Sequence, residues 1–333
     1  MKNILWFLAL ISVLLGVFAW QGWERYQGFL QTPLSISGEG QTFLLEPGTP
    51  GDEIVRQLGS LGLARPGWEW RLLMRLEPVV YRAGEYWLEA GITPQGLLAK
   101  LSSGAVLQHR FTLVEGWTFK QFAAALDANP VLAHQFDLAG SASWDSVSAY
   151  LGFEYPEGWV LPETYQFTRG DSDHDILARS HAAMVQALDE AWNSRDDELP
   201  VDSPYELLIL ASIIEKETSL DEERPLVAGV FTRRLKKGMR LQTDPTVIYG
   251  MGDAYDGDIR RRDLQTDTAY NTYTRRGLPP TPIAMPGRES LAAAARPAAG
   301  EALFFVADGK GGHTFSEKLE DHQQAVKKLT ERN

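Results

Sequence analysis

The sequence predicts an α+β protein with a single N-terminal transmembrane helix. Two patterns support this fold class: short β-like stretches alternate with amphipathic helical stretches, and one long uncharged apolar run stands at the start of the chain. Of the 333 residues, 44% are hydrophobic and 23% are charged, so most of the chain can bury a core, and wholesale disorder is excluded. A chain of this length holds about two domains of ordinary size.

The charge balance and the lack of cysteine exclude several classes of protein. Lys and Arg total 32 while Asp and Glu total 44, which gives a formal charge of −12 and argues against a nucleic-acid partner. The absence of cysteine excludes disulfides, thiolate zinc sites and a cysteine nucleophile. The six histidines show no metal-ligand spacing, and zinc-protease, hydrolase-elbow and P-loop motifs do not occur. We therefore expect neither a metal nor a cofactor.

The first element along the chain is the uncharged run from Ile4 to Trp23. A helix of this length spans about 30 Å, the thickness of the hydrocarbon core of a bilayer. A cleaved signal peptide is the alternative, but Trp20, Trp23 and Tyr26 are placed like the aromatic belt of a retained anchor. Lys2 stands on the short side of the run, so the N-terminus should stay in the cytoplasm. We expect a single-pass protein of the inner membrane with most of its chain in the periplasm.

Three segments after the anchor share one pattern, in which a glycine and a threonine precede apolar residues six, seven and ten positions after the glycine. The glycines are Gly48, Gly91 and Gly116, and the threonines are Thr49, Thr93 and Thr118. Each threonine is a candidate N-cap of a short helix, and β-like stretches precede the helices at residues 42–45, 85–88 and 109–114. Such units resemble LysM-like modules, which bind wall chains that contain N-acetylglucosamine. The alternative is a plain structural domain without affinity for sugar.

The second half of the chain contains an unusually clear helix start. Before it, residues 155–165 predict an ordered loop and residues 175–192 an amphipathic helix. In Ser203-Pro204-Tyr205-Glu206, the serine suits the N-cap, the proline the first helical position and the glutamate the third. The residues at 207–214 are all apolar or small, so we expect this helix to be buried on most sides.

Glu215 follows this apolar stretch and is the candidate catalytic residue. Burial disfavours the charged form of a carboxyl, so its pKa should rise toward the working pH, as a general acid requires. An ion pair with a nearby arginine and emergence into solvent at the helix end are the alternatives. Glu217 lies about 200° further around the helix and cannot share the face of Glu215.

Two polar loops follow a helix that we expect at residues 225–237. Residues 241–246 and 270–273 combine amides, hydroxyls and tyrosines, which suit the recognition of sugar hydroxyls and acetamides. The candidate substrate-binding residues are Gln242, Thr243, Asp244, Tyr249, Asn271 and Tyr273. Residues 309–313 predict a tight hairpin turn, in which His313 is structural or contacts substrate.

Five stretches in the second half closely resemble the endolytic murein transglycosylase family, the YceG-like proteins. They read EKET from Glu215, LQTDPTVIYG from Leu241, YNTY from Tyr270, GLPP from Gly277 and FVADGKGGHTF from Phe305. Several long motifs in the same order are far more specific than any one of them. The resemblance covers the whole chain and implies that Glu215 matches the catalytic glutamate of the family.

The resemblance implies a membrane-anchored lytic transglycosylase that cuts nascent peptidoglycan strands between N-acetylmuramic acid and N-acetylglucosamine and so terminates their elongation. Glu215 would protonate the glycosidic oxygen and then accept the proton of the muramoyl C6 hydroxyl, which closes onto C1 and leaves a 1,6-anhydro end. The expected partners are glycan strands and the penicillin-binding proteins of the synthetic machinery. The alternatives are a hydrolase that uses Asp244 as a second carboxylate and a non-catalytic wall-binding scaffold.

These observations predict five parts of the chain. Residues 1–26 form a cytoplasmic stub and transmembrane anchor, and residues 27–40 form a linker. The LysM-like module takes residues 41–128, and residues 129–200 connect it to the catalytic domain, on which they pack. The mixed α+β, YceG-like catalytic domain takes residues 201–333.

Overall fold

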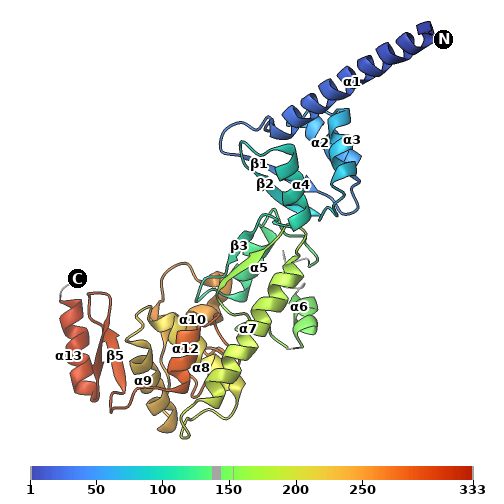
Figure 1. Cartoon of the computed structure of the whole chain (residues 1–333). Helices are drawn as coiled ribbons and strands as arrows, with labels where there is room; N and C mark the ends of the chain where they lie inside the picture. The colour runs from blue at the N-terminus through green and yellow to red at the C-terminus, as the bar shows by residue number, and fades with distance from the viewer. Residues whose placement is uncertain (1, 137–143, 153, 332–333) are drawn as a thin grey trace. The chain divides into compact units, whose positions relative to one another are not determined.

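The computed structural model describes residues 2–136, 144–152 and 154–331 and has the predicted α+β fold, in which helices accompany small two-stranded sheets (Figure 1). The chain forms two compact units. The first comprises Met1–His109 with Thr168–Gly170, and the second comprises Arg110–Phe167 with Asp171–Asn333. Parts of the predicted anchor, connecting region and catalytic domain, at Met1, 137–143, 153 and 332–333, lie outside the described residues. The five predicted domain bounds stay a prediction.

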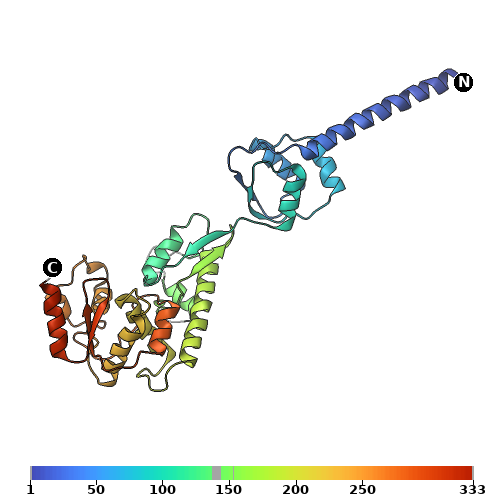
Figure 2. The ribbon, with the colours of Figure 1, turned by 60° about the vertical axis from the view of Figure 1, so that its left-hand side comes forward.

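Helix α1 (Lys2–Gln31) carries the long apolar segment of the first unit (Figures 1 and 2). The large apolar side chains from Ile4 to Trp23 are exposed, and Ile4–Gln31 is long and apolar enough to cross a membrane. The predicted apolar helix is therefore present. It continues beyond residue 27, where we expected a linker, because its last turns pack on the unit: Phe29 meets Trp70 edge-on, with ring centroids 5.2 Å apart.

The rest of the first unit is a small sheet with short helices. Its elements are β1 (Gln41–Leu45), α2 (Gly51–Ser60), α3 (Trp68–Leu76), β2 (Gly84–Leu88) and α4 (Pro94–Ser103). Strands β1 and β2 pair antiparallel, with Gln41 opposite Leu88. Phe43 and Tyr86 on these strands are fully buried against apolar side chains of the helices, so the unit has its own core.

The helix caps agree with the sequence prediction at two of three positions. The Thr93 hydroxyl accepts a backbone N–H at 3.2 Å and caps α4. Thr118 caps the first helix of the second unit and forms a complete capping box. Thr49 was a wrong prediction: α2 begins after Pro50, and the Thr49 hydroxyl instead donates to a backbone carbonyl three residues earlier, at 2.8 Å. The Thr49 hydroxyl is thus hydrogen-bonded within the turn before α2 and does not cap the helix.

The second unit is built around α8 (Pro204–Glu217). Before α8 come β3 (His109–Thr112), α5 (Phe119–Asp127), α6 (Trp144–Leu151), β4 (Thr164–Phe167) and α7 (Asp173–Asn193). After it come α9 (Arg224–Lys236), α10 (Asp244–Met251), η2 (Gly252–Ala254), α11 (Arg261–Gln265), α12 (Arg288–Ala295), β5 (Phe304–Ala307), β6 (His313–Ser316) and α13 (Leu319–Thr330). Helices α7, α9 and α12 all pack on α8, which explains why Leu207–Ile214 are buried throughout, as predicted.

The start of α8 follows the sequence prediction closely. The Ser203 hydroxyl accepts the backbone N–H of Glu206 at 3.2 Å, and Pro204 occupies the first turn. The Glu206 carboxylate accepts from the backbone N–H of Asp202 at 2.6 Å, one residue before the partner that a full capping box would use. The helix ends at Glu217, because the next residue, Thr218, has an extended backbone.

The segment at 241–246 differs from the predicted loop. Helix α10 begins at Asp244, so Asp244, Pro245 and Thr246 form its first turn. Pro245 stands in the first turn of this helix, where its missing N–H is not needed, so the polar composition that suggested a loop conceals a helix start. The predicted loop at Tyr270–Tyr273 is confirmed as a turn. The loop predicted at 155–165 is confirmed only as far as residue 163, because Thr164 and Tyr165 belong to β4, in which alternate side chains are buried.

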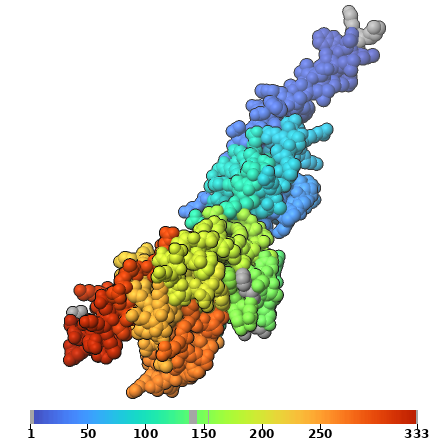
Figure 3. Space-filling view, turned by 90° about the horizontal axis from the view of Figure 1, so that it is seen from below, coloured from blue at the N-terminus to red at the C-terminus, as the bar shows by residue number. Residues whose placement is uncertain are grey.

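The chain ends in a hairpin and a helix that pack on the second unit. Strands β5 and β6 pair antiparallel, with Ala307 opposite His313, and residues 308–312 form the predicted tight turn. Helix α13 lies along this hairpin, and β5 packs on α9. In Figure 3 this C-terminal segment, in red, forms one continuous surface with the orange and yellow segments of the unit.

Candidate active site

A polar pocket of about 420 Å³ opens beside the C-terminal end of α8 in the second unit. Its walls are the last residue of α8, the segment at 241–244, Tyr273, the β5–β6 hairpin and the start of α13. Segments from the middle and the end of this unit therefore meet here, and Figure 2 shows the hairpin and α13 alongside the helices. The volume lies in the range of small-molecule sites, and both ionisable and aromatic side chains line the pocket.

Glu217 is the carboxyl that α8 brings to this pocket. It is the last residue of the helix, is partly buried, and accepts a hydrogen bond from the Thr243 hydroxyl. Burial raises the pKa of Glu217 to about 7, and the negative charge of Asp244 acts in the same direction. The Thr243 hydrogen bond and the charges of His313 and Arg234 act in the opposite direction. A carboxyl with this pKa can be protonated at neutral pH and donate its proton.

The segment that faces Glu217 is held in a strained conformation. Gln242 has φ of 51°, and among the described residues it alone combines a positive φ with a side chain. Its neighbour Leu241 is fixed by Arg234, whose buried guanidinium donates to the carbonyl of Leu241 at 2.7 Å and to that of Leu303 at 2.6 Å. Strain of this kind persists where surrounding contacts enforce it, often at functional sites. The segment thus places Gln242 and Thr243 in the pocket wall.

Asp244 and Tyr273 form a second polar group in the same wall. The Tyr273 hydroxyl donates to Asp244 Oδ1 at 2.6 Å, and burial raises the pKa of Tyr273 above its usual range. Asp244 belongs to the first turn of α10, where a negative charge is stabilised by the helix dipole. Four of the predicted substrate-binding residues thus line one pocket: Gln242, Thr243, Asp244 and Tyr273.

The other two predicted substrate-binding residues have different surroundings. Asn271 is fully buried, its amide donates to three backbone carbonyls within 3.2 Å, and its oxygen accepts from the Tyr273 backbone. The Tyr249 hydroxyl donates to Glu157 at 3.0 Å, and its ring packs on Tyr270. Neither residue is part of the pocket wall. Asn271 instead fixes the turn that carries Tyr273.

Glu215 lies on a different face of α8 and contacts a different element. Its side chain is 5% exposed, and Oε2 accepts from the backbone N–H of Gly287 at 2.9 Å and from the Ser290 hydroxyl at 2.8 Å. Both donors belong to the N-terminal turn of α12, so the carboxylate of Glu215 caps that helix. The Arg224 guanidinium lies 3.8 Å from the other carboxylate oxygen. This arrangement matches the structural ion pair that the sequence left open as an alternative.

The C-terminal hairpin supplies pocket residues that the sequence analysis did not assign to the site. Phe304 and Phe305 contribute aromatic surface, and the imidazoles of His313 and His322 add titratable groups. Only His313 was considered beforehand, as a residue of a hairpin turn. The signal that could have revealed the others is the long motif from Phe305 to Phe315, because a hairpin with so many ring side chains packs against another surface.

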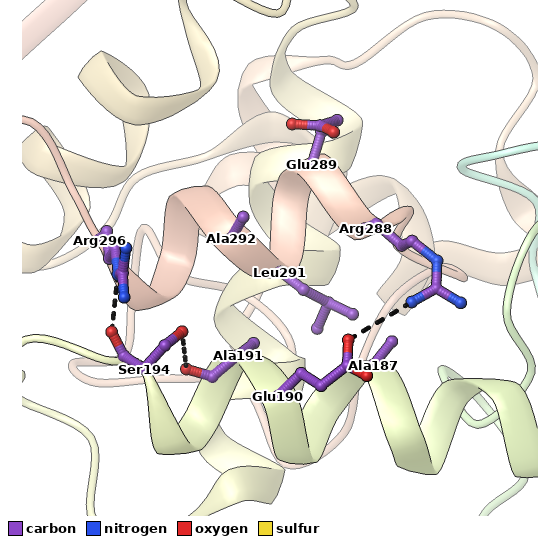
Figure 4. A pocket seen from close by; sticks show the side chains of 9 residues that line it. All are labelled: Ala187, Glu190, Ala191, Ser194, Arg288, Glu289, Leu291, Ala292 and Arg296. Carbon is purple, nitrogen blue, oxygen red and sulfur yellow. Dashed lines mark hydrogen bonds and ion pairs between the residues drawn. The ribbon is translucent and has the colours of Figure 1, made fainter.

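A smaller hollow of about 260 Å³ lies between α7 and α12 (Figure 4). Three of its charged side chains have partners: Arg288 lies 3.8 Å from Glu190, and Arg296 donates to the backbone of Ser194 at 2.7 Å. Small alanine side chains line much of the remainder. In the described parts of the chain, we find no group of three or more His, Asp or Glu side chains that could hold a metal ion.

Comparison with known proteins gives a consistent result. The model of the YceG-like family matches residues 43–328. An endolytic murein transglycosylase of Bacillus subtilis (strain 168) is 32% identical over 265 residues, which cover 74% of this chain and 73% of that protein. An endolytic murein transglycosylase of Streptococcus pneumoniae serotype 2 is 27% identical over 361 aligned positions, which cover 97% of this chain and 64% of that protein.

A solved structure is similar as well. The crystal structure of a YceG-like protein from Listeria monocytogenes superimposes with a TM-score of 0.56 and 27% sequence identity. The superposition covers 86% of this chain and 99% of that one. Since the second unit alone is shorter than this share of the chain, the similarity extends over parts of both units.

Proposed function

Since this chain belongs to the YceG-like family, we propose that it is an endolytic murein transglycosylase, which cuts peptidoglycan strands between N-acetylmuramic acid and N-acetylglucosamine. The reaction leaves 1,6-anhydro ends on N-acetylmuramic acid. The named relatives support the reaction, and the polar pocket beside α8 supplies a place for it.

The observation that carries the mechanism is the raised pKa of Glu217 within this pocket. We assign the role of general acid to Glu217, in place of the predicted Glu215. Glu217 lines the cavity, and its pKa of about 7 lets a substantial fraction carry the proton at neutral pH, whereas both hydrogen bonds to Glu215 come from the start of α12. Protonation of the glycosidic oxygen by Glu217 makes it a better leaving group as the bond to C1 breaks.

The nucleophile in this proposal belongs to the substrate. The C6 hydroxyl of the muramoyl sugar closes onto C1, so the enzyme needs to hold the ring and remove a proton. An intramolecular attack of this kind gains several kcal/mol when the groups are well oriented. Gln242, Thr243, Asp244 and Tyr273 line the pocket and are proposed to bind the saccharide. Asn271 and Tyr249 are proposed to act indirectly, by supporting this wall.

A two-carboxylate hydrolase is the second candidate, because Asp244 shares the pocket with Glu217. The deciding experiment is digestion of purified sacculi by the full-length protein in detergent, followed by mass spectrometry of the released fragments. We expect 1,6-anhydro ends within the glycan strands. Reducing N-acetylmuramic acid ends would establish the hydrolase instead, and binding without release would establish the wall-binding scaffold.

The first unit is proposed to bind glycan strands as a LysM-like module. Its strand and helix units support this role, and Trp68 and Trp87 are 38% and 37% exposed, so both can stack on sugar rings. The test is sedimentation of the full-length protein with sacculi, using a catalytically inactive variant. Replacement of both tryptophans by alanine should weaken binding several-fold, and unchanged binding would leave the unit a structural role.

Helix α1 is proposed to anchor the protein in the inner membrane, with its N-terminus in the cytoplasm and the two units in the periplasm. An anchor of this kind holds the enzyme where new strands emerge. Strand-polymerising penicillin-binding proteins are therefore proposed partners, and the proposed role is termination of strand elongation. Protease protection of the two units in intact cells would contradict this topology if it persisted after the outer membrane was opened.

A further inference from the structure

Glu223 and His313 form a buried acid–imidazole pair at the edge of the pocket. His313 Nδ1 lies 2.7 Å from Glu223 Oε2, and the backbone N–H of His313 donates to Glu223 Oε1, also at 2.7 Å. The Thr218 hydroxyl donates to Glu223 Oε2 at 3.1 Å. Glu223 therefore connects the segment after α8 to the first residue of β6, and it fixes both the backbone and the ring of His313.

Glycines in the β5–β6 turn allow Glu223 to approach His313 closely. A Cβ atom at Gly312 would lie 2.7 Å from Glu223 Oε1, so a side chain there would push the carboxylate away from His313. Gly309 and Gly311 have φ of 75° and 99°, a conformation that glycine adopts without strain. The glycines of this turn thus serve the contact between Glu223 and His313 as well as the tight turn itself.

The ionisation of Glu223 decides which nitrogen of His313 carries the proton. Burial opposes ionisation, but the hydrogen bonds from His313 and Thr218 outweigh it, so the pKa of Glu223 lies below its usual range. An ionised carboxylate only accepts hydrogen bonds, and Nδ1 must therefore be the donor. In the neutral ring this leaves a lone pair on Nε2, for which no described residue provides a hydrogen-bond partner.

His313 lines the same pocket as Glu217, and the two groups are close enough that a protonated His313 ring lowers the pKa of that carboxyl. The pocket therefore contains one group that can give a proton and another that can take one. A carboxylate that orients an imidazole so that its second nitrogen can accept a proton is a recurring catalytic arrangement. The same logic applies here, because the sugar hydroxyl that attacks C1 must lose a proton.

We propose that His313, oriented by Glu223, is the base that receives the proton of the muramoyl C6 hydroxyl. This inference rests on the transglycosylase function proposed above and adds a second catalytic residue to Glu217. Glu223 is a positioning residue. The proposal replaces the proton cycle expected from the sequence, in which one carboxyl both gives and takes the proton.

The step balances without a further reactant. Glu217 transfers its proton to the glycosidic oxygen as the C1–O bond breaks. The C6 oxygen forms a new bond to C1, and its proton passes to Nε2 of His313. The products are a 1,6-anhydro end, a free hydroxyl on the departing sugar, a Glu217 carboxylate and an imidazolium. Transfer of the proton from His313 to Glu217 through water then restores the starting state.

Several charged or titratable groups surround His313. They are Glu223 and Glu217 beside it, Asp308 in the hairpin turn, and Arg234, Asp244, Tyr273 and His322 in the pocket. Asp308 accepts from the backbone N–H groups of Lys310 and Gly312, and Tyr273 donates to Asp244. The pair with Glu223 distinguishes His313 from His322, whose ring stacks on Phe304.

The first experiment is the pH profile of kcat/KM for sacculus digestion by the full-length protein in detergent. Wild type should lose activity on the alkaline side, as Glu217 loses its proton, and on the acidic side, as the imidazole gains one. His313→Gln should lower kcat about 100-fold and remove the acidic decline while keeping the alkaline one. A profile that keeps its acidic decline, or a kcat within about threefold of wild type, would overturn the proposal.

The second experiment separates catalysis from structure. His313→Ala should regain activity when free imidazole is added, because the base is then supplied from solution. His134→Ala serves as the control, since His134 is partly exposed and does not line the pocket; it should keep wild-type activity and show no response to imidazole. Glu223→Gln should shift the acidic decline of the profile while KM changes little. A folded His313→Ala variant that imidazole does not rescue would count against the base.

The products of the wild-type digest distinguish a failure of the transglycosylase function from a failure of the base role proposed for His313. If wild type gives no 1,6-anhydro ends, the transglycosylase function fails, whatever His313 does. If wild type gives these ends and the His313 variants retain the full rate and profile, the function stands and only the base assignment fails.

Discussion

The two faces at the end of α8 carry the same side chain in opposite settings. On one face, Glu215 accepts two hydrogen bonds from the start of α12 and lies close to the buried Arg224. On the other face, Glu217 accepts one hydroxyl and borders a polar pocket beside Asp244. The hydrogen bonds of Glu215 tie α8 to α12, whereas burial raises the pKa of Glu217 and so suits it to proton transfer. The elements that each side chain contacts, α12 for Glu215 and the polar pocket for Glu217, separate the two proposed roles.

The largest effect is expected when Glu217, the proposed general acid, is replaced. Glu217→Gln should lower the rate of strand cleavage about 1,000-fold or more, because the amide cannot protonate the glycosidic oxygen. The fold should remain, since Gln can still accept from Thr243. The measurement is the release of anhydro-ended fragments, with circular dichroism as the control for folding. Substantial activity in this variant would return the role of the acid to Glu215 or Asp244.

The next effect concerns stability on the other face. Glu215→Ala leaves the Gly287 N–H and the Ser290 hydroxyl without their acceptor, and it removes one partner of the buried Arg224. We expect the free energy of unfolding to fall by about 2–4 kcal/mol. Urea denaturation measures this change. At a temperature where the variant is folded, cleavage should continue.

Glu215→Gln provides the matched comparison with Glu217→Gln, because both remove one charge from the same helix end. The Glu215 variant should lose stability and keep activity, and the Glu217 variant should do the reverse. If both variants lost activity equally, the two faces would not have separate roles.

The smallest effect is the pH dependence of stability. Burial raises the pKa of Glu217 from 4.5 to about 7, so between these pH values the folded state binds a proton that the unfolded state lacks. Stability should therefore fall as the pH rises from about 4.5 to 7. In this interval the Tm of Glu217→Gln should fall by a few degrees less than that of wild type. If the Tm of both proteins fell equally with rising pH, ionisation of Glu217 would not destabilise the folded state.

Glu157 offers a check on this interpretation. It accepts from the Phe119 backbone and the Tyr249 hydroxyl, and burial raises its pKa to about 8. Glu157→Gln should also reduce the fall of Tm with rising pH, and this reduction should extend to a higher pH. Its effect should add to that of Glu217→Gln.

The sequence predicted most of the fold because local signals determine it. Ser203 and Pro204 mark the start of α8, and the apolar stretch up to Ile214 predicts its burial. Thr93 and Thr118 cap their helices as expected. Thr49 failed as a cap because its hydroxyl has a competing partner in the preceding turn, a choice that depends on the backbone path.

The candidate site was less predictable because tertiary contacts define it. Glu215 and Glu217 both follow an apolar helix, and only the positions of α12 and the C-terminal hairpin distinguish their faces. Asn271 has the composition of a ligand-binding residue, but its amide is satisfied by nearby carbonyls. Gln242, Thr243, Asp244 and Tyr273 line the pocket, and the role of each in binding stays a prediction.

The pocket beside Glu217 is completed by some of the last residues of the chain, from Phe304 to His322. During synthesis the ribosome makes the acid roughly a hundred residues before this wall exists. A chain made only as far as residue 303 therefore carries Glu217 and the wall at 241–244, but lacks the aromatic and imidazole side chains of the opposite wall. The order of translation thus delays completion of the pocket until the segment from Phe304 to His322 has been made and has packed on the second unit.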